Sequence, residues 1–126
     1  MKIEHIAVWV KDLDASSDFY ERFLGGKGGS LYSNPKKAFA SRFISFDSGA
    51  RIELMTRTDK TETPPQNSLG YAHIAFSVGS AREVDRITAY MKEHGVFVES
   101  QPRYTGDGYY ESVVSDPDGN QVEITE

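Results

Sequence analysis

The chain has 126 residues and no cysteine, and this absence removes three kinds of chemistry at once. Disulfide bonds, thiolate metal ligands and cysteine nucleophiles are all excluded. Long apolar runs are missing too: none approaches the ~18 residues that a membrane-spanning helix needs. Lys2 and Glu4 stand near the start, where a signal peptide would have its apolar stretch. We therefore expect a cytoplasmic protein without a membrane partner.

Basic residues are scarce relative to acidic ones. Lysine and arginine number 14 against 19 aspartates and glutamates, which gives a formal net charge of −5. We expect no nucleic-acid partner, because sequence-independent binding to phosphates needs a basic surface. With 38% apolar and 26% charged residues, the composition is typical of a globular protein. The length suits a single domain over residues 1–126.

An internal repeat is the most informative feature that is present. His5-Ile6-Ala7 recurs as His73-Ile74-Ala75, and each copy opens a stretch that ends in a strand with a glutamate, Glu53 or Glu123. A repeat at this scale predicts two copies of one structural unit. The predicted boundaries are about 1–57 for repeat one, about 58–69 for a linker and about 70–126 for repeat two.

The pattern of each repeat predicts a strand, a helix and three further strands. Residues 3–10 predict a strand with Ile6, Val8 and Val10 on one face and His5, Ala7 and Trp9 on the other, and Asp12 can cap a helix that ends near Leu24. A capping box at residues 80–83 marks the second helix, which should end near His94. The remaining strands are expected within residues 30–56 and at 71–78, 96–98, 109–115 and 121–125. The order βαβββ, repeated twice, predicts an α+β fold.

The alternation also places the histidines and glutamates. In each of the four strands concerned, the histidine or glutamate lies opposite the continuous apolar face, so each repeat exposes one His and one Glu on the side its helix does not cover. Two imidazoles and two carboxylates form a candidate ligand set for a divalent metal, which the set alone cannot name. The alternative is an ordinary solvated sheet face.

Three kinds of short motif stand out: the two His-Ile-Ala strands, Asp18-Phe19-Tyr20 before Phe23-Leu24-Gly25, and Asp116-Pro117-Asp118-Gly119-Asn120 before Val122-Glu123. Together these motifs resemble the vicinal oxygen chelate superfamily, which includes glyoxalase I, bleomycin-resistance proteins, fosfomycin-resistance enzymes, methylmalonyl-CoA epimerase and extradiol dioxygenases. The resemblance covers essentially the whole chain. It implies two βαβββ repeats forming a mixed, curved sheet around a cleft with an open metal site.

The resemblance also implies a ligand set and an activity. The metal ligands would be His5, Glu53, His73 and Glu123, binding one divalent ion, with zinc or nickel ahead of iron, cobalt or manganese. A His-Glu-His-Glu set looks most like glyoxalase I, so the implied function is a lactoylglutathione lyase-type enzyme that isomerises a small oxygenated substrate through a metal-bound enediolate. Either glutamate can serve as the catalytic base, and Glu123 is preferred over Glu53.

Two other functions stay open. A non-catalytic small-molecule or antibiotic-binding resistance protein would have an aromatic groove and no metal. A ring-cleaving dioxygenase would need iron or manganese, usually with three protein ligands. By comparison with glutathione-dependent members of the family, Trp9 stands where an arginine is expected, and Arg57 where an asparagine is expected. Trp9, Arg57 and Tyr110 are the candidate substrate-binding residues, with ordinary packing as the alternative for each. Chains of this length in the family usually form homodimers.

Overall fold

The computed structural model describes residues 1–62, 65 and 68–126. It divides the chain into two compact units, Met1–Thr63 and Pro64–Glu126. Each unit contains one of the predicted repeats, so the α+β class with two repeats is confirmed. Parts of the predicted linker, residues 63–64 and 66–67, lie outside the described residues. No helix in the described part of the chain is long and apolar enough to cross a membrane.

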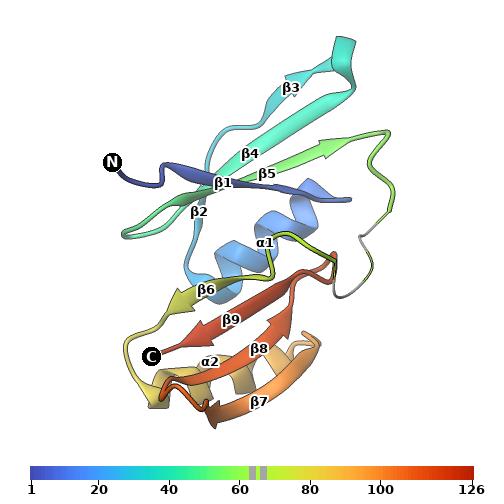
Figure 1. The fold of residues 1–126 in the computed structure, drawn as a ribbon. Helices are drawn as coiled ribbons and strands as arrows, with labels where there is room; N and C mark the ends of the chain where they lie inside the picture. The colour runs from blue at the N-terminus through green and yellow to red at the C-terminus, as the bar shows by residue number, and fades with distance from the viewer. Residues whose placement is uncertain (63–64, 66–67) are drawn as a thin grey trace. The chain divides into compact units, whose positions relative to one another are not determined.

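The first unit is a five-stranded mixed sheet with one helix (Figure 1). Its elements are β1 (His5–Trp9), α1 (Leu13–Leu24), β2 (Lys27–Gly28), β3 (Tyr32–Asn34), a short 3-10 helix (Pro35–Lys37), β4 (Phe39–Ser45) and β5 (Arg51–Arg57). The strand order is β1-β5-β4-β2, and β3 also pairs with β4. β1 runs parallel to β5, whereas the other pairs are antiparallel.

The second unit repeats this arrangement. Its elements are β6 (His73–Ser77), α2 (Ala81–Glu93), β7 (Val98–Tyr104), β8 (Tyr110–Ser115) and β9 (Gln121–Thr125). The strand order is β6-β9-β8-β7, with β6 parallel to β9. The short strands β2 and β3 of the first unit pair with successive parts of β4, so together they take the place that β7 takes in the second.

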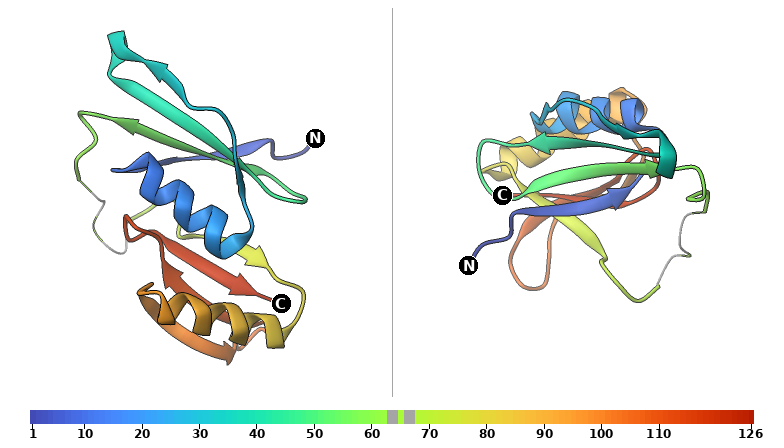
Figure 2. Two further views of the ribbon diagram at one scale, coloured as in Figure 1. Left: turned by 180° about the vertical axis from the view of Figure 1, so that it is seen from behind. Right: turned by 90° about the horizontal axis from the view of Figure 1, so that it is seen from above.

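Each helix covers one face of its own sheet, as Figure 2 shows for α1 and α2. The buried apolar side chains of the first unit include Tyr20, Ile44 and Leu54. Those of the second unit include Val84, Met91, Val114, Val122 and Ile124. Because neighbouring residues of a strand point to opposite faces, this packing leaves the odd-numbered residues of β5 and β9 on the open face.

Capping side chains fix where the helices begin, as predicted. The Asp12 carboxylate accepts hydrogen bonds from the backbone N–H groups of Asp14 and Ala15, at 2.9 and 3.0 Å. The Ser80 hydroxyl accepts one from Glu83 N–H, at 3.3 Å. The carboxylate of Glu83 pairs with Arg86. These caps satisfy N–H groups that the helix itself leaves unpaired.

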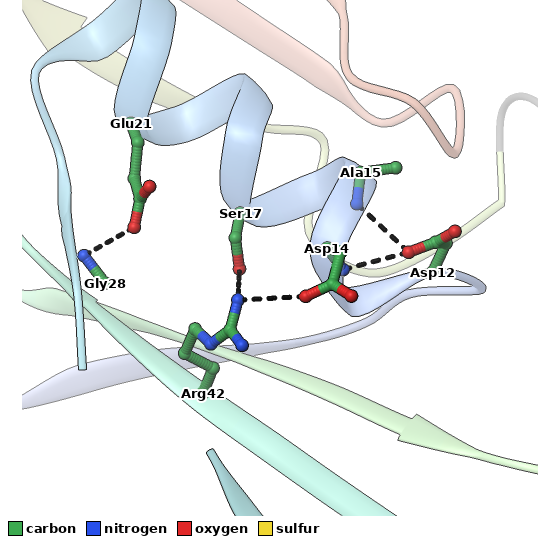
Figure 3. A network of polar contacts seen from close by, with 7 residues as sticks. All are labelled: Asp12, Asp14, Ala15, Ser17, Glu21, Gly28 and Arg42. Atoms are coloured by element: carbon green, nitrogen blue, oxygen red, sulfur yellow. Dashed lines mark hydrogen bonds and ion pairs between the residues drawn. The ribbon is translucent and has the colours of Figure 1, made fainter. Parts of the chain in front are cut away.

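Polar contacts hold α1 against β4 in the first unit (Figure 3). The Arg42 guanidinium, on β4, donates to Asp14 at 3.2 Å and to Ser17 at 3.1 Å. One turn further, the Glu21 carboxylate accepts a hydrogen bond from the backbone N–H of Gly28 at 2.7 Å. A Cβ atom at Gly28 would meet that carboxylate, so a larger residue there would displace the Glu21 side chain from this contact.

Two strands differ from their predictions: β2 lies before residue 30, where the expected strands of the first repeat begin, and β7 is longer than expected. Residues 96–98 were expected as a strand, but β7 begins at Val98 and continues to Tyr104. The sequence did not predict the full length of this strand, because the residues directly before Pro102 are polar and because proline has no backbone N–H to donate to a neighbouring strand. Within the described part of the chain, β7 pairs with β8 alone, at the edge of the sheet, and its register shifts around Pro102. An edge strand tolerates proline for that reason.

Candidate metal and substrate site

The first unit brings together one histidine and one glutamate on the open face of its sheet. Glu53 on β5 is paired with Ala7 on β1, two residues from His5. The imidazole Nε2 atom of His5 lies 3.7 Å from the Glu53 carboxylate. Their side chains are 39% and 18% exposed, so both are accessible from solvent. The alternation of side chains along these two strands predicted this face for both residues.

A neighbouring carboxylate orients the His5 ring. The Glu4 carboxylate lies 2.5 Å from Nδ1 of His5 and also pairs with Arg51. The hydrogen bond with His5, assisted by Arg51, lowers the pKa of Glu4. The ring also packs edge-on against Phe43, with centroids 5.3 Å apart. A histidine that donates Nδ1–H to a carboxylate presents the Nε2 lone pair, which is the arrangement of metal-binding histidines.

The second unit contains the matching pair. Glu123 on β9 is paired with Ala75 on β6, and Nε2 of His73 lies 3.4 Å from the Glu123 carboxylate. The exposed fractions are 43% for His73 and 15% for Glu123, close to those of the first pair. The two repeats therefore produce the same local geometry independently.

Glu111 is a residue of this face that the sequence did not single out. It lies on β8, is buried, and has Arg103 of β7 at 3.6 Å. Burial raises the pKa of Glu111, and the charge of Glu123 raises it further. Residues two apart on a strand share a face, so Glu111 lies on the same face as Val113, which pairs with Glu123. This alternation is the feature of the sequence that could have identified Glu111.

The chemistry and spacing of the two pairs fit a divalent metal. Imidazole and carboxylate bind such ions at about 2.0–2.2 Å, and tetrahedral angles then place two donors about 3.3–3.6 Å apart. The separation in the second unit lies in this range, and that in the first is slightly longer. Among the described residues no group of three or more such side chains gathers. Each unit thus supplies two donors.

Trp9 and Arg57, two of the candidate substrate-binding residues, meet at one end of the first sheet. The Arg57 guanidinium lies 5.4 Å from the Trp9 ring centroid. It also makes two hydrogen bonds to Asp59, at 2.5 and 2.9 Å, which raise the pKa of Arg57 and lower that of Asp59. These two hydrogen bonds to Asp59 hold the Arg57 guanidinium in place beside Trp9.

Tyr110, the third candidate, points to the other face of its sheet. Its hydroxyl donates to Asp85 of α2 at 2.8 Å, and this hydrogen bond raises the pKa of the phenol. Its ring packs against Tyr104, with centroids 4.8 Å apart. The structure therefore places Tyr110 on the helix side and away from the face that carries Glu123.

Comparison with known proteins identifies the family and the fold of this chain. Residues 2–124 match the model of the Glyoxalase/Bleomycin resistance protein/Dioxygenase superfamily. The lactoylglutathione lyase of Escherichia coli O157:H7 is 32% identical, over all of this chain and 93% of its own length. The glyoxalase family protein from Enterococcus faecalis is 26% identical, with a TM-score of 0.82 over 99% of this chain and 97% of its own. The trypanothione-dependent glyoxalase I of Leishmania major is 25% identical, with a TM-score of 0.78 over 100% of this chain and 86% of its own. The chain belongs to the glyoxalase/bleomycin resistance protein/dioxygenase superfamily.

Proposed function

We propose that the protein is a metal-dependent enzyme of the glyoxalase I type, with His5, Glu53, His73 and Glu123 as ligands of one divalent ion. One observation supports this most strongly: each unit separately places a histidine Nε2 and a glutamate carboxylate 3.4 or 3.7 Å apart on its open sheet face. On an ordinary solvated sheet face, no interaction requires a histidine and a glutamate to lie side by side in both units. The 32% identity with a lactoylglutathione lyase supports the same activity.

The proposed reaction moves a proton between adjacent carbons of a small oxygenated substrate. A bound divalent ion would supply positive charge for the substrate oxygens that become negative. The chain itself must supply the base that removes the carbon-bound proton and returns it one carbon over. Proton transfer by a positioned side chain contributes typically about 10²–10⁴ in rate.

We assign this base to Glu123 and not to Glu53, because the two glutamates differ in their neighbours. The buried carboxyl group of Glu111 adjoins Glu123, so a second carboxyl group lies next to the proposed base in the second unit. Both glutamates have a histidine beside them, but the register partner of Glu53 on β4 is the aromatic residue Phe43, whereas Glu111 adds a carboxyl group beside Glu123. Substituting Glu123 by glutamine should therefore reduce turnover more than the same change at Glu53.

The test of the metal site is the elemental metal content of the untagged, purified protein. We expect about one divalent ion per chain, as the proposed four-ligand set implies. The Glu53→Ala/Glu123→Ala double variant should lose it. The matched control is Glu62→Ala/Glu93→Ala, which removes one exposed glutamate from each unit away from the pairs and should keep the metal.

Activity is then measured with hemithioacetals of several thiols, using protein with a known metal content. Turnover that depends on the metal and falls in the Glu123→Gln variant would support the proposal. A metal-free wild-type protein that takes up no zinc, nickel, iron or manganese would contradict it and favour a non-catalytic binding protein. Oxygen consumption with a catechol would favour a dioxygenase instead. The homodimer implied by the family resemblance stays a prediction, which analytical ultracentrifugation would test.

A further inference from the structure

A cluster of aromatic side chains lies on the open face of the first sheet. Trp9 meets Phe39 edge-on at 6.2 Å between ring centroids, and Tyr32 packs against Phe39 at the same distance. Trp9 is 40% exposed and Tyr32 57%, so the rings present an accessible apolar surface. We call Trp9, Tyr32 and Phe39 the aromatic cluster. Aromatic rings on a sheet face favour contact with another apolar or aromatic group.

Charged groups at one side of the cluster give it an excess of positive charge. The Lys60 ammonium lies 5.3 Å from the centroid of the Trp9 ring, and the Arg57 guanidinium lies at 5.4 Å. Asp59 pairs with Arg57 through two hydrogen bonds and balances its charge. The Lys60 ammonium therefore supplies positive charge beside the Trp9 ring. An organic anion complements this charge.

The position of the aromatic cluster connects it to the proposed metal ligands of the same unit. Ala7, the register partner of Glu53, precedes Trp9 by two residues on β1. Two residues along a strand correspond to about 7 Å, and they share a face. On β4, Phe39 likewise lies four residues from Phe43, which pairs with Glu53. A ligand about the size of two linked rings can therefore reach from the cluster to Glu53.

We propose that the aromatic cluster and Lys60 form a subsite for an aryl group carrying a carboxylate, so that the substrate is a small aromatic organic anion. This inference rests on the proposed function, which supplies the reacting end of the substrate at the metal ligands. The rings bind the aryl group by apolar contact, and the Lys60 ammonium attracts the carboxylate. Glutathione offers no aromatic ring for this surface, which agrees with the absence of an arginine at position 9.

The subsite can be tested directly because Trp9 is the only tryptophan in the chain. Its fluorescence is followed while phenylacetate, phenylacetamide, acetate or glutathione is added to the full-length protein in the presence of a metal chelator. For about ten non-hydrogen atoms at about 0.3 kcal/mol each, phenylacetate should bind with a Kd of about 1–10 mM. Phenylacetamide, which lacks the charge, should bind about fivefold more weakly.

Two variants separate the contributions. Lys60→Met should remove the preference for phenylacetate over phenylacetamide, whereas Lys92→Met, a matched change on α2 of the other unit, should keep it. Phe39→Leu should weaken both aryl ligands. Equal or tighter binding of acetate or glutathione, or a preference that survives Lys60→Met, would overturn the inference. Because the chelator removes any metal, this result is independent of the metal measurement, so the subsite and the metal site can fail separately.

Discussion

A buried pair of hydroxyl groups gives the sharpest prediction about the stability of the second unit. Thr88 on α2 and Ser112 on β8 are 2% and 0% exposed, and their oxygens lie 2.6 Å apart. The Thr88 hydroxyl donates its one proton to the carbonyl of Val84, also at 2.6 Å. Because a hydroxyl has only one proton, Ser112 must be the donor in the bond between the two side chains.

This assignment makes the two single substitutions unequal. Thr88→Val removes the acceptor and leaves the Ser112 O–H buried without a partner, which costs about 2 kcal/mol of unfolding free energy. Ser112→Ala removes a donor and leaves the Thr88–Val84 bond intact, so the cost is about 1 kcal/mol. In the double variant both groups are apolar and nothing is left unpaired, so its cost should also be about 1 kcal/mol. The coupling between the two sites is then about 2 kcal/mol.

The assay is urea unfolding followed by far-ultraviolet circular dichroism and, separately, by the fluorescence of Trp9. The two signals report on the whole chain and on the first unit, so their coincidence tests whether the two units unfold together. In thermal unfolding, the Thr88→Val change should lower the Tm by about 6–10 °C. Ser33→Ala, an exposed hydroxyl on β3, should change the unfolding free energy by less than about 0.5 kcal/mol. Additive effects at positions 88 and 112, or a larger loss for Ser112→Ala than for Thr88→Val, would refute the assigned proton positions.

Three further predictions concern the site and the core. Burial raises the pKa of Glu111, so the wild type loses unfolding free energy as the pH rises above the unfolded-state pKa of about 4.3. In the presence of a chelator, the unfolding free energy of Glu111→Gln should therefore increase relative to that of the wild type between about pH 4 and pH 7. Urea unfolding at both pH values measures this difference, and a difference that stays constant would contradict the prediction. Glu4→Ala removes the acceptor of the His5 Nδ1–H bond and should weaken metal binding about tenfold, measured by competition with a chromophoric chelator. Gly26→Ala would place a Cβ 2.5 Å from the buried Ile44 side chain and should cost about 1–3 kcal/mol in urea unfolding, whereas Gly106→Ala meets nothing within 4 Å and should be nearly neutral.

Much of the fold could be predicted because its signals are local. Asp12 and Ser80 cap helices through hydrogen bonds within three residues, and these bonds form where the sequence places them. The strand with Glu123 alternates apolar and polar residues over its length, and the strand with Glu53 does so from Arg51 to Leu54, so the face of each glutamate followed from its neighbours. The internal repeat then indicated that one unit would resemble the other.

The less accurate predictions concern non-local facts. Whether residues around Pro102 form a strand depends on their position at the sheet edge, which pairing with β8 decides and the local sequence does not. Tyr109 and Tyr110 are adjacent and chemically alike, so only the register of β8 shows that Tyr110 reaches Asp85 on the helix side. The same register brings Glu111 to the face of Glu123, a relation between two strands that composition does not encode.

The two halves share the proposed pair of ligands but differ in the residues that surround it, and the roles proposed for the two units follow from this difference. In the first unit, Glu4 fixes the His5 ring, and the aromatic cluster extends the same sheet face. In the second, Glu111 adds a buried carboxyl group beside Glu123. A symmetric site would have two equivalent candidate bases, whereas proton transfer to one side of a substrate needs only one. On the proposed function, we infer that this divergence of the neighbours gives substrate orientation to the first unit and proton transfer to the second. The Glu53→Gln and Glu123→Gln variants distinguish these roles: the first should mainly weaken metal binding, and the second should mainly lower kcat at full metal occupancy.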